Sequence, residues 1–156
     1  SAVTLGEVGD PAAVEPLSAA LADPDRYVRT RAALALAAIG GPACDVLTGV
    51  AGSSDPEIRW AAALALGRIA SPACVPALCA LRTDPDPQVR AIAAARMLPE
   101  AAAALLADPE WTVRAAAVAQ APLEALHAVL DDPEPDVRAL AAERLGIAAP
   151  PPPRTP

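Results

Sequence analysis

The sequence has 156 residues, of which 54% are hydrophobic, yet only 2% are aromatic and Phe is absent. This length fits one domain, and a core built mostly from Ala, Leu and Val favours closely packed helices over a β-sheet, which would require β-branched and aromatic residues. The formal net charge is −7 and the cationic residues are scattered singly. That balance argues against a nucleic-acid partner and against an anionic membrane surface.

Signals that would direct the chain to or across a membrane are not visible. Charges and prolines interrupt every apolar stretch before it reaches the length that spans a bilayer, and residues 1–5 carry no positive region followed by an apolar core. We therefore expect a cytoplasmic protein. The first residue is Ser and not Met, which fits a trimmed chain or a part of a longer protein.

The first predicted element is a helix over residues 6–21, with Val14, Leu17 and Leu21 as its apolar residues. It is followed by a motif that recurs along the chain, in which an Asp-Pro turn precedes an apolar residue and Arg. The five copies are Asp23-Pro24 with Val28-Arg29, Asp55-Pro56 with Ile58-Arg59, Asp84-Pro85 with Val89-Arg90, Asp108-Pro109 with Val113-Arg114, and Asp132-Pro133 with Val137-Arg138. The arginines lie 30, 31, 24 and 24 residues apart, so the last two units are shorter by about two helical turns.

A helix is predicted after each Asp-Pro turn. The residues Val28, Ala32, Ala35, Leu36 and Ile39 fall at offsets 0, 4, 7, 8 and 11, and the residues from Ile58 to Ile69 repeat these offsets, which is one face of an α-helix. Asp55-Pro56 and Asp86-Pro87 predict an N-cap with Pro at the first helical position. Gly40-Gly41-Pro42 and Ser71-Pro72 predict helix ends.

A second, shorter helix is predicted in each unit. Its apolar residues are Leu47 and Val50, then Val75, Leu78 and Leu81, then Leu105 and Leu106, and finally Leu123, Leu126 and Leu130. Because no helix pair can bury its apolar face alone, about five stacked pairs should share one core. The sequence thus predicts an all-α solenoid over residues 1–147. A proline-rich tail over residues 148–156 should favour polyproline II, as a linker or as a ligand for an aromatic groove.

The repeat resembles a known family. Residues 6–17, Gly-Glu-Val-Gly-Asp-Pro-Ala-Ala-Val-Glu-Pro-Leu, and the Asp23-Pro24 turn with Val28-Arg29 are similar to the bacterial HEAT-like repeat, also called the phycobilisome-lyase HEAT-like repeat. The two 24-residue units resemble the leucine-rich-repeat variant. The resemblance covers roughly residues 5–146 and implies a right-handed superhelix with first helices on the convex side and second helices on the concave side. Because most members of this family are adaptors or scaffolds, the resemblance implies such a role. A few members carry out bilin attachment or DNA glycosylase chemistry, and the latter requires a basic channel that this chain lacks.

The repeat arginines, Arg29, Arg59, Arg90, Arg114 and Arg138, allow two interpretations. They form either an anion-binding row or a structural ladder, in which each Arg bonds an Asp at the turn of its own or a neighbouring repeat. Because each Arg recurs together with its Asp, we favour the ladder.

Two of the three cysteines occupy similar places in successive repeats. Cys44 and Cys74 are 30 residues apart and can lie side by side in the stack, where a disulfide or a metal pair is conceivable. However, the sequence has no Cys-x-x-Cys, and its only histidine, His127, lies two repeats away. We therefore expect Cys44, Cys74 and Cys79 to be free, buried thiols and expect no metal site.

Trp60 and Trp111 lie outside the periodic core face, so each either fills space between helices or anchors a partner. The polar residues of the second helices are further candidate protein contacts, spread over four repeats: Asp45, Thr48, Arg82, Glu124 and His127. Because this spread disfavours a compact site and no phosphate loop or Ser/His/Asp set is visible, we expect no enzyme and no cofactor.

The sequence therefore predicts a non-catalytic protein–protein interaction scaffold or adaptor. The alternative is a lyase-like or maturation chaperone that assists cofactor attachment to another protein, and a third possibility is a structural segment of a larger solenoid. Acidic residues crowd the turns and predict a negative ridge along one edge, which would attract a partner with a basic surface. They are Asp23, Asp25, Asp84, Asp86, Asp108, Glu110, Asp131, Asp132, Glu134 and Asp136.

Overall fold

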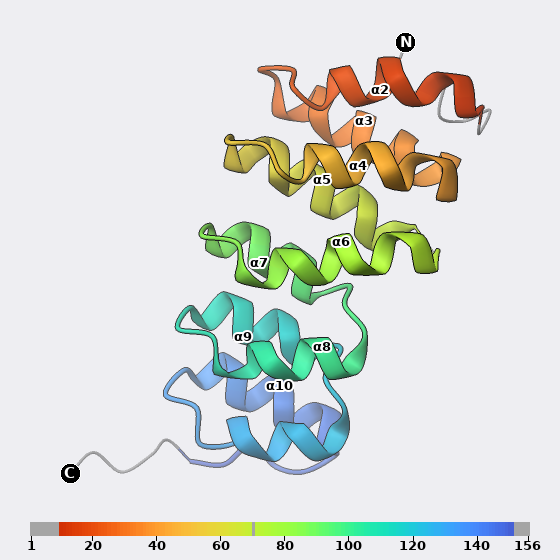
Figure 1. Ribbon diagram of the computed structural model, residues 1–156. Helices are drawn as coiled ribbons and strands as arrows, with labels where there is room; N and C mark the ends of the chain where they lie inside the picture. The colour runs from red at the N-terminus through yellow and green to blue at the C-terminus, as the bar shows by residue number, and fades with distance from the viewer. Residues whose placement is uncertain (1–9, 70, 152–156) are drawn as a thin grey trace.

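The structure, a computed structural model, describes residues 10–69 and 71–151. Every regular element in these ranges is an α-helix or a 3₁₀-helix. The helices form two layers that stack from the N-terminal end to the C-terminal end, as Figure 1 shows. This arrangement confirms the predicted all-α superhelical repeat.

The first layer contains the helices that follow the Asp-Pro turns. They are α3 (Arg26–Ile39), α5 (Pro56–Arg68), α7 (Pro87–Ala94), α9 (Trp111–Val118) and α10 (Pro135–Leu145). The side chains of Asp25, Asp55 and Asp86 accept hydrogen bonds from backbone amides of the first turn, at 2.8, 2.9 and 2.8 Å. Glu110 and Glu134 occupy the same N-cap position without a capping hydrogen bond from the side chain. Aspartate is short enough to reach these amides, which explains its recurrence at the turns.

The second layer contains shorter helices, several with a 3₁₀ turn at one end. They are η1 (Pro11–Ala13) with α2 (Val14–Ala20), η2 (Gly41–Ala43) with α4 (Cys44–Val50), η3 (Pro72–Cys74) with α6 (Val75–Ala80) and η4 (Leu81–Thr83), α8 (Pro99–Ala103) with η5 (Ala104–Ala107), and η6 (Leu123–Val129). Residues 6–9 of the first predicted helix lie outside the described residues.

The two shorter repeats keep the layers by shortening both helices. The first-layer helices α7 and α9 have 8 residues each, whereas α3 has 14 and α5 has 13. The second element of the last complete repeat, η6, is a 3₁₀-helix of 7 residues. A 3₁₀-helix rises about 2.0 Å per residue against about 1.5 Å in an α-helix, so fewer residues still cross the width of the stack.

One continuous core lies between the layers. Its largest side chains with almost no exposed surface include Leu17, Leu36, Leu47, Leu66 and Leu126, which come from both layers and from both ends of the stack. Alanines such as Ala62 and Ala93 are fully buried between neighbouring helices and allow close approach. Each repeat therefore buries its apolar face against the next.

The chain leaves the last helix at Gly146, which has a left-handed backbone with φ of 69°. Residues 148–151 form no helix, and residues 152–156 of the predicted tail lie outside the described part of the chain. The domain boundary at residue 147 stays a prediction. None of the described helices combines the length and the apolar character needed to cross a bilayer.

Candidate functional site

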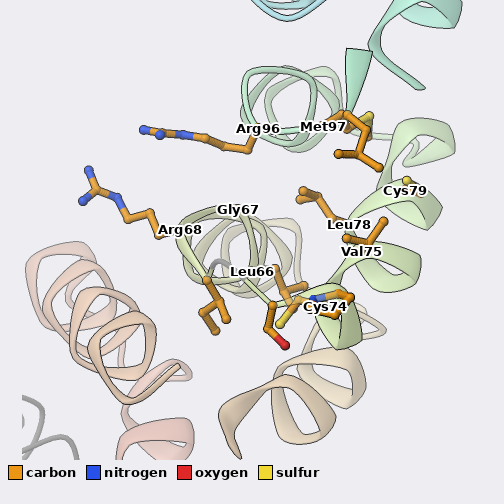
Figure 2. Close-up of a pocket in the computed structure, with 13 residues that line it drawn as sticks. Leu66, Gly67, Arg68, Cys74, Val75, Leu78, Cys79, Arg96 and Met97 are labelled. Carbon is orange, nitrogen blue, oxygen red and sulfur yellow. The ribbon is translucent and has the colours of Figure 1, made fainter. Parts of the chain in front are cut away.

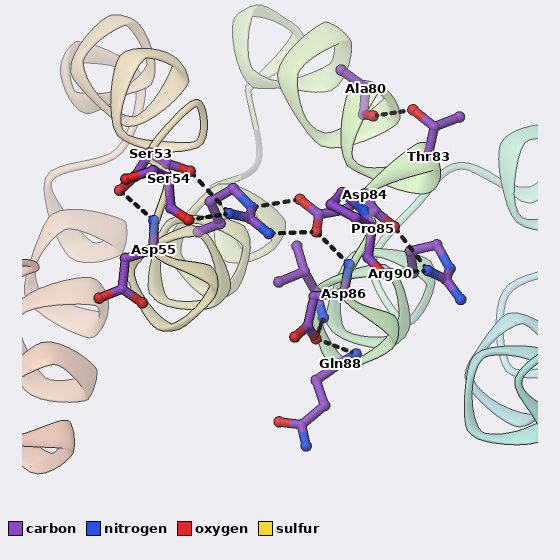
Figure 3. A network of polar contacts seen from close by, with 12 residues as sticks. Ser53, Ser54, Asp55, Ala80, Thr83, Asp84, Pro85, Asp86, Gln88 and Arg90 are labelled. Carbon is purple, nitrogen blue, oxygen red and sulfur yellow. Dashed lines mark hydrogen bonds and ion pairs between the residues drawn. The ribbon is translucent and has the colours of Figure 1, made fainter.

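The repeat arginines bridge successive turns. Arg59 donates from Nε and Nη2 to the carboxylate of Asp84 in the next repeat, at 2.8 and 3.0 Å. Its Nη1 donates to the carbonyl oxygens of Ser53 and Ser54 in its own turn, at 3.0 and 3.1 Å. Figure 3 shows this network, in which one guanidinium holds two neighbouring turns together.

The same geometry recurs along the stack. Arg90 pairs with Asp108 and Arg114 with Asp132, at Nε to oxygen distances of 2.8 and 2.7 Å. The ends of the array differ. Arg29 pairs with Glu57 at 2.8 Å, a side chain that is 48% exposed, and Arg138 donates to the carbonyl oxygens of Asp132 and Pro133. A structural ladder requires contacts of this kind between neighbouring turns. The contribution of the ladder to the stability of the fold stays a prediction.

These contacts shift the ionisation of the paired groups. The hydrogen bond from Arg114 to Asp132 raises the pKa of the Arg114 guanidinium, against the opposing effect of burial. Burial is the largest single influence on the pKa of Asp132 and acts to raise it, but the hydrogen bonds from Arg114 and the amide of Glu134, together with the charges of Arg114 and Arg138, lower the pKa overall. Both shifts favour the charged pair.

The acidic ridge is smaller than the sequence predicted. Asp84, Asp108 and Asp132 are buried and paired with arginines, so these three carboxylates are not part of the surface. Residue type and turn position do not show which carboxylate points inward, so the sequence counted these three together with the exposed ones. Two exposed carboxylates at this edge, Asp131 and Asp136, have no hydrogen bond or ion pair within the described residues.

The two tryptophans have different environments. Trp60 on α5 is partly buried and packs against the core, and the guanidinium carbon Cζ of Arg26 lies 5.0 Å from the centroid of its ring. Trp111, the first residue of α9, is 40% exposed. Trp60 therefore fills space in part, whereas Trp111 is free to contact a partner.

The polar candidates of the second layer are not brought together. All five side chains are exposed, and within residues 10–69 and 71–151 no hydrogen bond or ion pair joins any two of Asp45, Thr48, Arg82, Glu124 and His127. The hydroxyl of Thr48 donates to the carbonyl oxygen of Cys44 at 2.7 Å. The described residues also contain no cluster of three or more potential metal ligands. These residues remain candidate contacts only as separate points along the second layer.

The expectation of three free thiols was wrong. Cys44 and Cys74 form a disulfide, with their Cα atoms 5.2 Å apart, and Cys79 is free. Cys44 begins α4 and Cys74 ends η3, so both lie at the start of a second-layer helix. Stacking brings these equivalent points of successive repeats within the Cα separation that a disulfide requires. The similar sequence positions were a usable signal, but the lack of a metal motif does not argue against a disulfide.

A cavity of about 380 Å³ lies beside this disulfide. Leu66, Val75, Leu78 and Met97 supply apolar lining, and Figure 2 shows that the side chains of Arg68 and Arg96 extend away from this group. The cavity therefore has a mainly apolar lining without a converging set of polar groups.

A groove that sequence reasoning did not identify lies on the first layer. It has a volume of about 570 Å³ and is lined by Trp60, Pro87, Gln88, Ala91, Ile92, Ala95, Glu110 and Thr112. The sequence carried one signal for this groove, because Trp60 departs from the residues that other repeats carry at the same position.

The fold and these surfaces define an α-helical repeat solenoid. The sequence matches the family of HEAT repeats over residues 1–54 and 43–98. Because these ranges together cover more than half of the chain, it belongs to the HEAT repeat family, as the resemblance implied. A comparison with curated proteins gives no significant match.

Solved structures share the same fold. The complex of CpcE and CpcF of phycocyanin lyase from Nostoc sp. PCC7120 matches with a TM-score of 0.64 and 22% identity, over 90% of this chain and 93% of that chain. The condensin Cnd3-Cnd2 subcomplex of S. pombe matches with a TM-score of 0.64 and 16% identity, over 85% of this chain. This chain spans only 22% of the condensin chain. A designed armadillo repeat protein matches with a TM-score of 0.53 and 18% identity, over 93% of this chain and 90% of that chain.

Proposed function

We propose that this chain is a non-catalytic adaptor that binds another protein through a basic surface of that partner. The HEAT repeat fold supports this proposal, because stacked repeats expose a long, regular surface that suits protein recognition. The observation that carries the proposal is the negative charge that remains along the edge formed by the Asp-Pro turns, here called the turn edge. It remains after the carboxylates that pair with ladder arginines are set aside. Asp131 and Asp136 are exposed there without a cationic partner among the described residues.

Other carboxylates add to the negative field of this edge. Asp25 and Asp55 are exposed and use one oxygen each to cap a helix, and such a hydrogen bond leaves the negative charge in place. Each ladder arginine that pairs with a carboxylate offsets one negative charge of this edge, and Arg138, which donates to carbonyl oxygens, offsets one more. A field of this kind attracts a basic protein surface and accelerates association.

The distribution of polar side chains supports a binding role over a catalytic one. An active site requires reacting groups within hydrogen-bonding reach of one another, and the second-layer candidates are spread over four repeats. The lyase-like alternative has only the likeness to the CpcE and CpcF complex in its favour, and at 22% identity that likeness concerns the fold. The acidic edge also disfavours nucleic acid as the partner.

Capture from an extract of the source cells tests this proposal. The purified chain is immobilised, nucleic acid is removed by nuclease, and binding is compared at about 0.05 M and 0.5 M salt, since added salt screens surface charges over roughly 10 Å at 0.1 M. We expect protein partners that are retained at low salt and released at high salt.

A pair of variants makes the test specific. Asp131→Asn with Asp136→Asn removes two charges from the turn edge without breaking a helix cap, and we expect weaker capture. Glu15→Gln with Glu143→Gln removes two exposed charges elsewhere and should leave capture unchanged. Capture that is insensitive to salt, or direct binding of purified DNA or RNA, would contradict the proposal.

A further inference from the structure

The groove on the first layer combines an apolar floor with polar walls. Pro87, Ala91 and Ile92 of α7 and Ala95, which follows this helix, supply the floor. Trp60 comes from α5, and Glu110 and Thr112 come from the start of α9. Its volume of about 570 Å³ lies within the range of about 300–1,000 Å³ that is typical of ligand sites. Three neighbouring repeats therefore contribute to one recess.

Trp60 departs from the repeat pattern and lines this groove, whereas Trp111, a second departure, is not among the lining residues. The position after the repeat arginine holds Trp60 in one unit and Thr30 or Ala in the others. The first helical residue is Trp111 in α9, where α5, α7 and α10 begin with proline. Stacking does not require tryptophan at either position, since the other repeats stack without it.

Trp60 is the aromatic residue that lines this groove. The sequence contains two Trp, one Tyr and no Phe, and all three aromatic residues lie near the beginning of first-layer helices. Tyr27 on α3 is 71% exposed and Trp111 is 40% exposed. Arg26 contacts the Trp60 ring from α3, which holds the indole at the side of the groove. Aromatic side chains are the usual anchors of protein interfaces.

The wall of the groove offers a carboxylate that the fold does not use for capping. Glu110 occupies the N-cap position of α9 without a capping bond. Within the described residues, the carboxylate accepts a hydrogen bond only from the hydroxyl of Thr112, at the long distance of 3.5 Å. A partly buried carboxylate beside an apolar floor favours a cationic group that is attached to an apolar one.

We propose that this groove docks an extended segment of a partner protein that carries an arginine or lysine beside an apolar side chain. The cation pairs with Glu110, and the apolar side chain packs between Trp60 and Ile92. This assignment rests on the proposed adaptor function and names the surface and the chemistry of its partner. It places the docking site on the first layer, whereas the polar candidates named from the sequence lie on the second layer.

Selection from a phage-displayed library of random linear peptides tests the proposal on the full chain. We expect enriched sequences in which arginine or lysine neighbours an apolar residue. The best peptide, labelled with fluorescein, is then titrated by fluorescence anisotropy. We expect its affinity to fall about tenfold or more for Trp60→Ala, the scale of an interface anchor, and several-fold for Glu110→Gln together with a weaker dependence on salt.

Matched variants separate docking from folding. Ile92→Ala shortens an apolar side chain that lines the groove and should keep the fold while weakening binding. Leu140→Ala removes an apolar side chain that is 40% exposed on α10, and Glu134→Gln changes the other N-cap glutamate that lacks a capping bond. Both controls should bind the peptide like the unchanged chain. Circular dichroism of every variant shows whether the helices are retained.

The outcomes distinguish this inference from the broader function. Peptides that bind equally well to the Ile92→Ala and Glu110→Gln variants show binding at another surface, which overturns the groove assignment and leaves the adaptor proposal intact. A selection that enriches no cationic and apolar motif also overturns it. The capture experiment judges the adaptor proposal independently, because it does not depend on the groove.

Discussion

The substitution Arg59→Ala gives the sharpest test of the arginine ladder. It removes two bonds to the Asp84 carboxylate and two bonds to the carbonyl oxygens of Ser53 and Ser54. The Asp84 side chain is only 5% exposed, so its charge would stay buried without the guanidinium. Breaking a buried pair costs about 3–5 kcal/mol. Asp84 keeps a bond from the amide of Asp86, and water can enter at the partly exposed turn, so we expect a loss of about 3 kcal/mol.

Urea unfolding followed by circular dichroism measures this loss. Arg29→Ala is the matched control, because its partner Glu57 is 48% exposed and can return to water, so the loss should be smaller by about 1 kcal/mol or more. The double variant with Asp84→Ala should show a coupling of about 1 kcal/mol or more between the two side chains. A loss below about 0.5 kcal/mol for Arg59→Ala, which is typical of an ordinary surface site, would refute the ladder.

Three further predictions concern other parts of the fold. The pKa of Asp132 is lowered in the folded protein. The charged Asp132 side chain therefore stabilises the fold above the unfolded pKa of about 3.9, and this stabilisation is lost as the pH falls through the folded pKa. Asp132→Asn should consequently cost stability at pH 7 and very little in strong acid. Thiol titration of denatured, unreduced protein should detect one thiol, Cys79, and reduction should lower stability by about 3–4 kcal/mol, as expected for a closed loop of this length. Gly67→Ala should destabilise α5, because the added Cβ would lie 2.6 Å from the Cβ of Arg96, whereas Gly49→Ala on α4, with nothing within 4 Å, should stabilise by up to about 1 kcal/mol. The first prediction is contradicted if Asp132→Asn costs the same stability in acid as at pH 7. The second is contradicted if three thiols are detected before reduction, and the third if Gly67→Ala leaves the stability unchanged.

A cytoplasmic location stays a prediction, and the redox state of the Cys44–Cys74 disulfide in the cell can test it. Cytosolic thiols are normally kept reduced, whereas disulfides persist in oxidising compartments. Alkylation of the thiols at the moment of cell lysis reports the state of Cys44 and Cys74 in the cell. An intact disulfide in freshly lysed cells would favour an oxidising compartment over the predicted location.

The positions of the helices and their buried faces could be predicted from the sequence, because they depend on interactions between neighbouring residues. Asp55 followed by Pro56 supplies a cap and a first residue that needs no amide partner, and these requirements involve only neighbouring residues. The apolar offsets after Val28 and Ile58 select one helix face for burial. The number of repeats, the two layers and the shorter C-terminal units could therefore be predicted from spacing alone.

Tertiary structure decided which residues meet across repeats. Arg59 pairs with Asp84, 25 residues away, and Arg90 pairs with Asp108, 18 residues away, because these pairings depend on how far one repeat turns over the next. The bond between Cys44 and Cys74 and the groove beside Trp60 have the same origin. Both form where side chains of separate helices converge, and that convergence follows from the packing of the whole stack, which no single repeat encodes.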